Sequence, residues 1–211
     1  MIRVLLVDDQ ALVRSGLRML CDSADDIEVV GEASCGASAV RRTLAERPSV
    51  VLMDLRMPGV DGIEATRRIT DSAPRTKVVV LTTFDDDEHL FPALRAGACG
   101  FLGKDSSPPR ILDAIRRAAA GDSPFGPDVL RRVVRRATGD RDTADESAAA
   151  LTPREREVVR LVGSGATNQE IAVALHLGIT TVKSYLATAM TKTGARNRVL
   201  LAVYAVRNGL A

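Results

Sequence analysis

Residues 50–62 have the sequence VVLMDLRMPGVDG, which combines an unbroken apolar run, a carboxylate and a turn. Residues 50–53 are apolar on both faces of an extended chain, a pattern typical of a strand buried on both sides of a parallel sheet. Asp54 follows directly, residues 57–59 predict a turn, and Gly62 precedes the next helical pattern. This stretch therefore predicts a buried strand that ends in an acidic residue and turns into a helix.

Four more apolar runs of this kind lie in the first 120 residues, at 2–7, 27–30, 78–81 and 99–102. Amphipathic stretches separate them. The pattern predicts an α/β fold with a five-stranded, doubly wound parallel sheet of flavodoxin-like order 2-1-3-4-5. Pro92 lies inside the fourth helical pattern and is expected to kink or shorten that helix. Neither GxGxxG nor a P-loop follows the first strand, which disfavours a nucleotide-binding version of this fold.

Polar side chains stand at the carboxyl ends of four of these strands. In the order 2-1-3-4-5 those four strands are neighbours, so their ends are expected to meet at one crevice of the sheet. The remaining strand lies at the sheet edge, and its end at Gly31 and Glu32 is not needed for this site. The converging residues are Asp8, Asp9, Asp54, Thr82 and Lys104.

Three clustered carboxylates favour a bound cation, because without one their charges repel. Hard oxygen ligands with open positions suit Mg²⁺, and a nearby lysine supplies a positive charge for phosphate. Asp54 is a carboxylate that can accept a phosphoryl group as an acyl phosphate. The residues alone therefore predict Mg²⁺-dependent phosphoryl chemistry at Asp54, with Lys104 and the Thr82 hydroxyl beside it.

The composition disfavours several classes of protein. The chain has 211 residues, three cysteines without close spacing and two histidines. A disulfide framework, a zinc ribbon, a histidine-based metal site and a Ser–His triad are therefore not expected. Cys21, Cys35 and Cys99 are expected to be small buried hydrophobic residues. No early apolar run is long enough for a membrane span or a signal peptide, so we expect a cytoplasmic protein without a membrane partner.

The net charge of +2 hides an uneven distribution. Residues 1–120 carry 16 basic and 18 acidic side chains, whereas residues 151–211 carry eight and three. This asymmetry predicts two modules with different partners, of which the second is a candidate for binding nucleic acid. Residues 121–150 contain structure-breaking glycines and prolines and are expected to form a linker, with room for a short basic helix at 128–137.

The second module begins with a capping box in which Glu155 follows Thr152 by three residues, which predicts the start of a helix. Gly163 ends this helix, Asn168 is expected to cap the next one, and a third helix opens near Thr181. These helices are short and closely spaced. They predict a small all-α helix-turn-helix domain at 151–211.

The third helix of this module has one apolar and one polar face. Val182, Leu186 and Met190 recur at intervals of four residues and are expected to face the core. The opposite face is short-chained, rich in hydroxyl groups and free of acids, so it can enter a major groove of double-stranded DNA. The last helix, at 197–206, is apolar nearly all round, and one of its faces is expected to form a dimer contact. The outward residues of the third helix are Lys183, Ser184, Ala187, Thr188 and Thr191.

The first 120 residues resemble the receiver domain of two-component response regulators. The resemblance rests on Asp8-Asp9, DLRMPGVDG at 54–62, LTTF at 81–84 and FLGKD at 101–105. It implies that a sensor histidine kinase phosphorylates Asp54 in the presence of Mg²⁺. The metal ligands that it implies are Asp9 and Asp54 directly, Asp8 through water, and the main-chain carbonyl of Arg56.

The same resemblance implies a switch. Thr82 would turn toward the phosphoryl group, Phe101 would change rotamer to fill the space left, and Lys104 would pair with the phosphoryl oxygens. Two positions depart from the usual receiver pattern. Gly103 stands where an apolar strand residue is common, and Asp105 follows Lys104 where many receivers have proline, which leaves the geometry of that peptide open.

Residues 151–211 resemble the LuxR-type DNA-binding domain of NarL/FixJ-type transcription regulators. The resemblance rests on LTPREREV at 151–158, NQEIA at 168–172 and TVKSY at 181–185. It implies that the third helix reads DNA through Lys183, Ser184 and Ala187, with Thr188 on the same face. It implies contacts to the DNA phosphates or backbone for Thr181, Tyr185 and Asn168.

The two resemblances together predict a phosphorylation-switched transcription regulator rather than an enzyme, whose phosphorylated form dimerises or frees its DNA-binding helix. One alternative is a phosphorylation-independent DNA-binding protein that uses the first module for constitutive dimerisation or ligand binding. The other is an Asp-nucleophile phosphatase, for which the chain shows neither a leaving-group acid nor a cap domain. The kinase and its signal, the operator, the sign of regulation, and the choice between interdomain inhibition and receiver dimerisation stay open.

Overall fold

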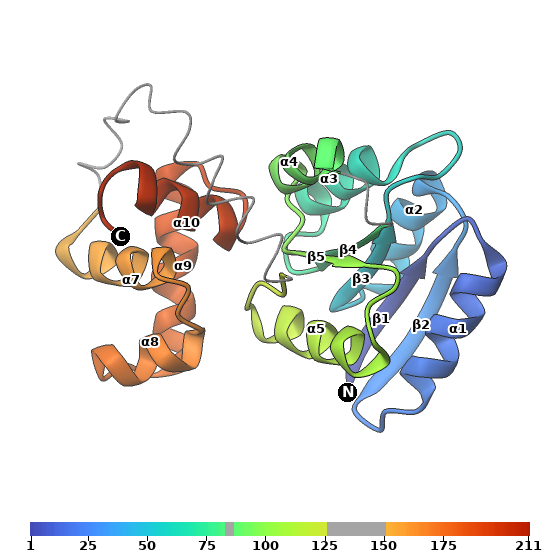
Figure 1. Ribbon diagram of the computed structural model, residues 1–211, viewed down its shortest axis with the longest axis horizontal. Helices are drawn as coiled ribbons and strands as arrows, with labels where there is room; N and C mark the ends of the chain where they lie inside the picture. The colour runs from blue at the N-terminus through green and yellow to red at the C-terminus, as the bar shows by residue number, and fades with distance from the viewer. Residues whose placement is uncertain (83–86, 126–150) are drawn as a thin grey trace. The chain divides into compact units, whose positions relative to one another are not determined.

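The computed structural model describes residues 1–82, 87–125 and 151–211. The chain divides into two compact units, Met1–Phe125 and Gly126–Ala211 (Figure 1). Each unit has its own hydrophobic core. The short helix predicted at 128–137 lies outside the described residues. No single helix in the described ranges is long and apolar enough to cross a membrane.

The first unit is built on a five-stranded parallel sheet of order β2-β1-β3-β4-β5, as the apolar runs predict. The register pairs Val7 of β1 with Met53 of β3. Asp8 and Asp54, one residue further along each strand, are therefore brought side by side at the carboxyl edge. The strands are β1 (Ile2–Val7), β2 (Ile27–Ala33), β3 (Val50–Asp54), β4 (Lys77–Thr82) and β5 (Gly100–Gly103).

Helices cover both faces of this sheet (Figure 1). Alternate residues of each strand enter different cores: Leu6 and Leu52 pack on the side of α1 and α5, and Val7 and Met53 pack on the side of α2 and α3. Pro92 lies inside α4, which has ten residues and continues for four residues beyond the proline. The helices are α1 (Ala11–Asp22), α2 (Gly36–Glu46), α3 (Gly62–Ser72), α4 (Asp87–Ala96) and α5 (Pro108–Ala120).

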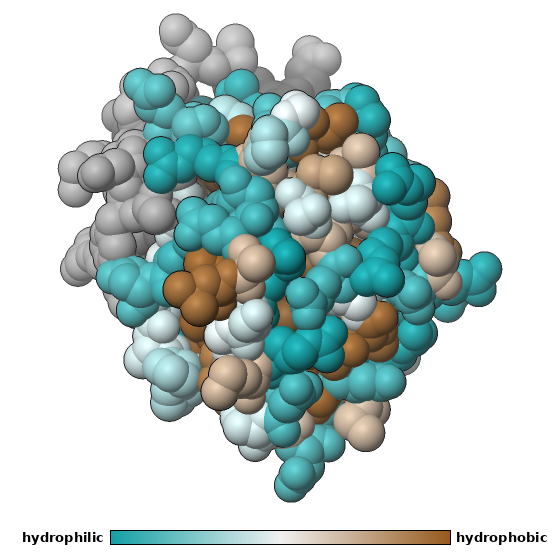
Figure 2. All heavy atoms as spheres, turned by 90° about the vertical axis from the view of Figure 1, so that its right-hand side faces the viewer, coloured by the Kyte–Doolittle hydropathy of each residue, from teal (hydrophilic) through white to brown (hydrophobic). Residues whose placement is uncertain are grey.

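The outward face of α1 carries two exposed apolar side chains. Leu12 is 86% exposed and Met19 is 74% exposed, whereas Leu17 and Cys21 on the inner face are buried. Figure 2 views the molecule from this side and shows small apolar patches separated by hydrophilic side chains. Leu12 lies three residues along the chain from Asp9, so the start of α1 presents an apolar side chain close in sequence to the predicted site.

The three cysteines are free thiols in two kinds of surroundings. Cys21 and Cys99 are buried as predicted, and burial raises their pKa to about 11 and about 12. The prediction is wrong for Cys35, which is half-buried at the start of α2. The hydroxyl of Ser38, 3.4 Å from the Cys35 sulfur, lowers the pKa of that thiol.

The first unit extends beyond the boundary predicted at residue 120. Helix α5 ends at Ala120, but the main-chain N–H of Phe101 in β5 donates to the Pro124 carbonyl at 3.1 Å, and Phe125 forms a parallel bridge with Phe101. Gly100 allows this approach, because a Cβ there would lie 2.6 Å from Cγ of Pro124. Residues 121–125 therefore belong to the first unit and not to a linker.

The second unit is a small all-α domain, and two capping boxes begin its first two helices. Thr152 pairs with Glu155 at the start of α7, as predicted, and Thr167 pairs with Glu170 at the start of α8. The prediction that Asn168 caps the second helix is wrong by one residue, because the Thr167–Glu170 spacing satisfies the box. The helices are α7 (Pro153–Gly163), α8 (Asn168–Leu175), α9 (Ile179–Thr193) and α10 (Arg198–Arg207).

Helices α9 and α10 use their apolar residues differently. In α9 Val182 and Leu186 are buried as predicted, while Met190 is half-buried and packs on the edge of the core. In α10 the buried residues are Val199, Leu201, Tyr204 and Ala205. Leu200, Val203 and Val206 recur every three residues and are only partly buried. Helix α10 therefore keeps an apolar stripe that its own domain does not fully cover.

Candidate functional site

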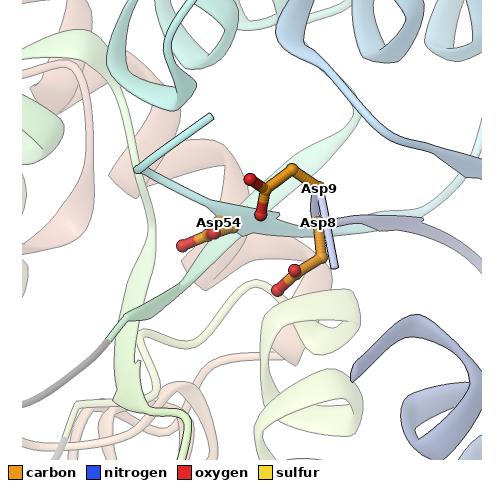
Figure 3. Close-up of side chains that lie close together, drawn as sticks. All are labelled: Asp8, Asp9 and Asp54. Carbon is orange, nitrogen blue, oxygen red and sulfur yellow. The ribbon is translucent and has the colours of Figure 1, made fainter. Parts of the chain in front are cut away.

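Three carboxylates meet at the carboxyl edge of the central strands. Asp8 and Asp9 follow β1 and Asp54 ends β3, and one ligand oxygen of each lies within 4.8 Å of the others (Figure 3). Asp8 and Asp54 are buried, with 1% and 4% exposure, whereas Asp9 is exposed. The sheet register thus brings together the acidic residues that the sequence analysis singled out.

Lys104 connects two of these carboxylates. Its Nζ lies 2.7 Å from Oδ2 of Asp8 and 2.9 Å from Oδ2 of Asp54. Burial raises the pKa of the Asp54 carboxyl above its usual value, although the Lys104 ammonium opposes that rise. Burial also opposes the charge on Lys104, but hydrogen bonds to the two carboxylates outweigh it and raise the lysine pKa. Each partner therefore stabilises the charge of the other, although both side chains are largely buried.

The donor set fits a hard divalent cation. Three carboxylates supply oxygen ligands from one small region, and Asp9 keeps the site open to solvent, which suits an ion such as Mg²⁺ that retains water. Arg56 follows Asp54 by two residues, and its main chain also donates a hydrogen bond to the Asp54 carboxylate. Its carbonyl is the remaining ligand candidate on the chain that leaves β3.

Thr82 and Phe101 lie on the neighbouring strands β4 and β5. Both are buried, with 2% and 4% exposure. The register pairs Thr82 with Gly103, and the main-chain N–H of Lys104 donates to the Thr82 carbonyl at 2.7 Å. A main-chain hydrogen bond therefore joins Thr82 directly to Lys104, the residue that follows β5. The described residues contain no cis peptide bond, so the peptide between Lys104 and Asp105 is trans.

Arg14 was not identified in the sequence analysis. This residue lies in α1 and contacts the acidic loop that follows β1, at Asp8 and Asp9. Its Nη1 donates to the main-chain carbonyls of Asp8 and Asp9, and its Nε donates to Glu32 at the end of β2. The end of β2, predicted to be unnecessary, therefore supports the site through this arginine. The available signal was the position of Arg14 in the first turn of α1, where a long side chain points back toward the helix start.

In the second unit, the outward face of α9 carries the predicted DNA-contacting residues. Lys183, Ser184, Ala187 and Thr188 are exposed, as is Thr181 in the first turn. The hydroxyls of Ser184 and Thr188 donate to carbonyls one turn earlier, at 3.1 and 3.0 Å. Their oxygens keep lone pairs that can accept hydrogen bonds from base edges.

Two predicted contact residues are less accessible. Tyr185 is half-buried and packs against the core of its domain. Asn168 is only 4% exposed, and its side-chain oxygen accepts a hydrogen bond from Nη1 of Arg198 at 2.7 Å. The prediction that Asn168 contacts a DNA phosphate therefore does not fit the structure, because its side chain joins α8 to α10 inside the domain.

The family of the chain follows from comparison with known proteins. Residues 4–116 match the response regulator receiver domain, and residues 149–205 match the bacterial regulatory proteins of the luxR family. The chain is 42% identical to the transcriptional regulatory protein LiaR of Bacillus subtilis (strain 168), over 100% of this chain and 99% of LiaR.

Solved structures show the same two-part architecture. The chain resembles the response regulator ChrA of a heme-sensing two-component system, with 34% identity, a TM-score of 0.55 and coverage of 100% of this chain and 98% of ChrA. It also resembles a structure of two RcsB dimers bound to two parallel DNAs, with 26% identity, a TM-score of 0.57 and 98% coverage of both chains. The chain therefore belongs to the two-component response regulators that join a receiver domain to a LuxR-family DNA-binding domain.

Proposed function

We propose that a sensor histidine kinase phosphorylates this protein on Asp54 in the presence of Mg²⁺. The observation that carries the proposal is the cluster of Asp8, Asp9 and Asp54 with Lys104 2.9 Å from the Asp54 carboxylate. Asp9 and Asp54 would bind the ion directly, and Asp8 through water. The main-chain carbonyl of Arg56 completes the protein ligands.

The proposed transfer forms one bond and breaks one. An oxygen of the Asp54 carboxylate attacks the phosphorus of a kinase phosphohistidine and forms an acyl phosphate. The phosphorus–nitrogen bond breaks, and its electron pair returns to the imidazole, which takes up a proton from water. Lys104 pairs with the oxygens of the transferred group, and bound Mg²⁺ supplies further charge neutralisation. The chain acts only on itself in this step and is a regulator, not an enzyme with a separate substrate.

The proposed switch starts at Thr82. Phosphorylation adds negative charge beside the end of β4, and the Thr82 hydroxyl turns toward the phosphoryl oxygens. Phe101 then changes rotamer to fill the space left. Because Thr82 and Phe101 lie on paired strands, the change moves a packed part of the sheet and shifts a pre-existing equilibrium between two forms.

The proposed output is sequence-specific binding to double-stranded DNA. Lys183, Ser184 and Ala187 face the bases in the major groove, and Thr181, Tyr185 and Thr188 contact phosphates or the groove wall. The exposure of this face supports the proposal, with Tyr185 as its least accessible member. The target is chromosomal DNA, which puts the site of action in the cytoplasm.

The proposed active form is a homodimer. Leu200, Val203 and Val206 form a partly exposed apolar stripe on α10, and a second copy of the stripe would cover it. The similar structure of RcsB dimers bound to DNA supports a dimeric form on DNA. A two-fold dimer requires two half-sites in a roughly palindromic operator.

The test uses the full chain with Mg²⁺ and acetyl phosphate. We expect wild-type protein to gain one acid-labile phosphate, measured by intact mass. Asp54→Ala should gain none, and Asp71→Ala, which removes an exposed carboxylate of α3, should behave like wild type. A wild-type protein that takes up no phosphate, or an Asp54→Ala variant that still does, would refute phosphorylation at Asp54.

The same samples test whether phosphorylation controls DNA binding. We expect the phosphorylated wild type to bind a selected operator more tightly than the unphosphorylated protein and to dimerise at lower concentration. An affinity that is the same with and without phosphate, and unchanged in Asp54→Ala, would favour a phosphorylation-independent regulator whose receiver is a constitutive module.

A further inference from the structure

The acidic loop after β1 is held by its main chain as well as by its side chains. Nη1 of Arg14 lies 2.7 Å from the Asp8 carbonyl oxygen and 3.3 Å from the Asp9 carbonyl oxygen. The guanidinium therefore contacts two consecutive peptide groups of this loop. Its side chain is 17% exposed, which limits competition from water.

Arg14 is itself fixed by the edge strand β2. Its Nε donates to Oε2 of Glu32 at 3.3 Å, and Nε of Arg18 donates to the other carboxylate oxygen at 2.6 Å. The Glu32 carbonyl accepts from Nη1 of Arg42 at 2.7 Å. The Arg18 and Arg14 guanidinium groups hold the pKa of the Glu32 carboxyl below its usual value. Glu32 is thus a charged, immobilised acceptor that orients Arg14.

Asp8 and Asp9 depend on this support to different degrees. The Asp8 side chain accepts from the Gln10 N–H at 2.9 Å and lies 2.7 Å from Lys104 Nζ, and the Asp8 N–H donates to Ala33 in β2. Asp9 is exposed, and its main-chain carbonyl accepts a hydrogen bond from Arg14. Loss of Arg14 would therefore act mainly on the orientation of Asp9, the carboxylate that would ligate the ion directly.

We infer that Arg14 is a positioning residue for the metal-dependent phosphorylation of Asp54, and that Glu32 orients it. This inference rests on the proposed function of the acidic cluster. By donating hydrogen bonds to the main-chain carbonyls of Asp8 and Asp9, Arg14 holds the backbone in the conformation that directs the Asp9 carboxylate toward Asp54. Groups that orient metal ligands from outside the coordination sphere commonly change metal affinity by about 10- to 100-fold. A guanidinium suits the task because it donates from Nη1 and Nε in a fixed geometry, which a lysine ammonium does not reproduce.

The experiment measures Mg²⁺ binding to the full chain by isothermal titration calorimetry without a phosphodonor. Arg14→Gln should weaken Mg²⁺ binding by about tenfold, Arg14→Lys should restore part of it, and Glu32→Gln should show a smaller loss in the same direction. Arg116→Gln is the control, because it breaks a comparable arginine–carboxylate pair with Asp26 among half-exposed side chains. It should bind Mg²⁺ like wild type.

A second readout separates positioning from damage to the fold. In Arg14→Gln the Mg²⁺ concentration for half-maximal phosphorylation by acetyl phosphate should rise about tenfold, while the rate at saturating Mg²⁺ returns close to wild type. Wild-type Mg²⁺ affinity in a folded Arg14→Gln protein overturns the inference. If that variant does not fold, wild-type affinity in Glu32→Gln overturns it. A wild-type protein that binds Mg²⁺ but takes up no phosphate overturns the proposed function alone, since the titration still decides the role of Arg14.

Discussion

The Nζ atom of Lys104 lies 2.9 Å from Oδ2 of Asp54, so the proposed phosphoacceptor is paired with a cation before any phosphoryl group arrives. The same ammonium also contacts Asp8. Lys104 therefore has two opposite effects on the site. It competes with Mg²⁺ for the carboxylates, and it supplies positive charge that stabilises the transferring group.

Replacing Lys104 with alanine should separate these effects. We expect Lys104→Ala to bind Mg²⁺ more tightly, because Asp8 and Asp54 lose a competing cation. We expect its phosphorylation by acetyl phosphate to slow by about 100-fold, the usual cost of removing one charge-stabilising donor. Calorimetry and phosphorylation time courses measure the two effects. Lys77→Ala, at the opposite end of β4, is the control, and a wild-type rate in Lys104→Ala would contradict the role assigned to the lysine.

Gly62 and Gly16 should respond oppositely to alanine. A Cβ at Gly62 would overlap the Asp54 carbonyl and lie 2.6 Å from Cα of Leu55, so the end of β3 must move. We expect Gly62→Ala to lower the free energy of unfolding by about 1 to 3 kcal/mol. A Cβ at Gly16, on the exposed side of α1, meets nothing within 4 Å, and Gly16→Ala should raise stability by about 0.5 to 1 kcal/mol. Urea unfolding followed by circular dichroism measures both, and effects of the same sign would contradict the prediction.

Glu155 should stabilise the DNA-binding domain in a pH-dependent manner. Nζ of Lys192 donates to both Glu155 carboxylate oxygens, at 3.0 and 2.8 Å, and holds the pKa of this carboxyl below its usual value. Its stabilisation is therefore present above the pKa of the unfolded chain and is lost as the pH falls through the lower folded-state pKa. Glu155→Gln keeps a capping side chain but removes the charge, and we expect a loss of about 1 to 2 kcal/mol at pH 7.

Thermal unfolding of the full chain at neutral and acidic pH tests this prediction. The difference between wild type and Glu155→Gln should shrink as the pH approaches the folded-state pKa of Glu155. Glu157→Gln removes a carboxylate of the same helix that pairs with Arg154 in a half-exposed setting, so its effect should stay below about 1 kcal/mol. A Glu155→Gln deficit that does not change with pH would mean that packing, and not the ion pair, carries the effect.

Lys183 should determine sequence preference as well as affinity. We expect Lys183→Ala to weaken binding to an operator selected from random DNA by about 1 to 3 kcal/mol and to relax the preference at one base pair. Arg160→Ala removes the same charge from the exposed surface of α7 and should leave sequence preference unchanged. Fluorescence anisotropy across several salt concentrations measures both variants. An equal loss on every DNA sequence would identify Lys183 as a phosphate contact instead.

Much of the receiver fold could be predicted from the sequence because its strands are buried on both faces. The run at 50–53 has no polar interruption. Such a run is typical of a strand buried on both faces, which is found almost only in parallel sheets covered by helices. The meeting of Asp8 with Asp54 then follows from strand order alone. The register between β1 and β3 confirms that expectation.

Other features depend on choices that local sequence does not settle. Thr167 and Asn168 are both good capping residues, and only the spacing to Glu170 decides between them. The contact of Arg14 with Glu32 joins residues from different elements through long side chains that no periodicity reveals. Residues 121–125 can pack beside β5 only because Gly100 has no side chain, and the sequence does not reveal this contact. Pro124 by itself indicates only that regular secondary structure ends nearby.

The bridge between Phe101 and Phe125 has a consequence for the solubility of the receiver. Strand β5 is an edge strand, and an uncovered edge offers free main-chain donors and acceptors to strands of other molecules. Pro124 and Phe125 occupy part of that edge, and the proline ring offers no further donor. A receiver fragment cut after Ala120, where α5 ends, would expose this edge and should aggregate more readily than a fragment that ends at Phe125. The last five residues of the unit thus cover part of the β5 edge and hinder the addition of a strand from another molecule.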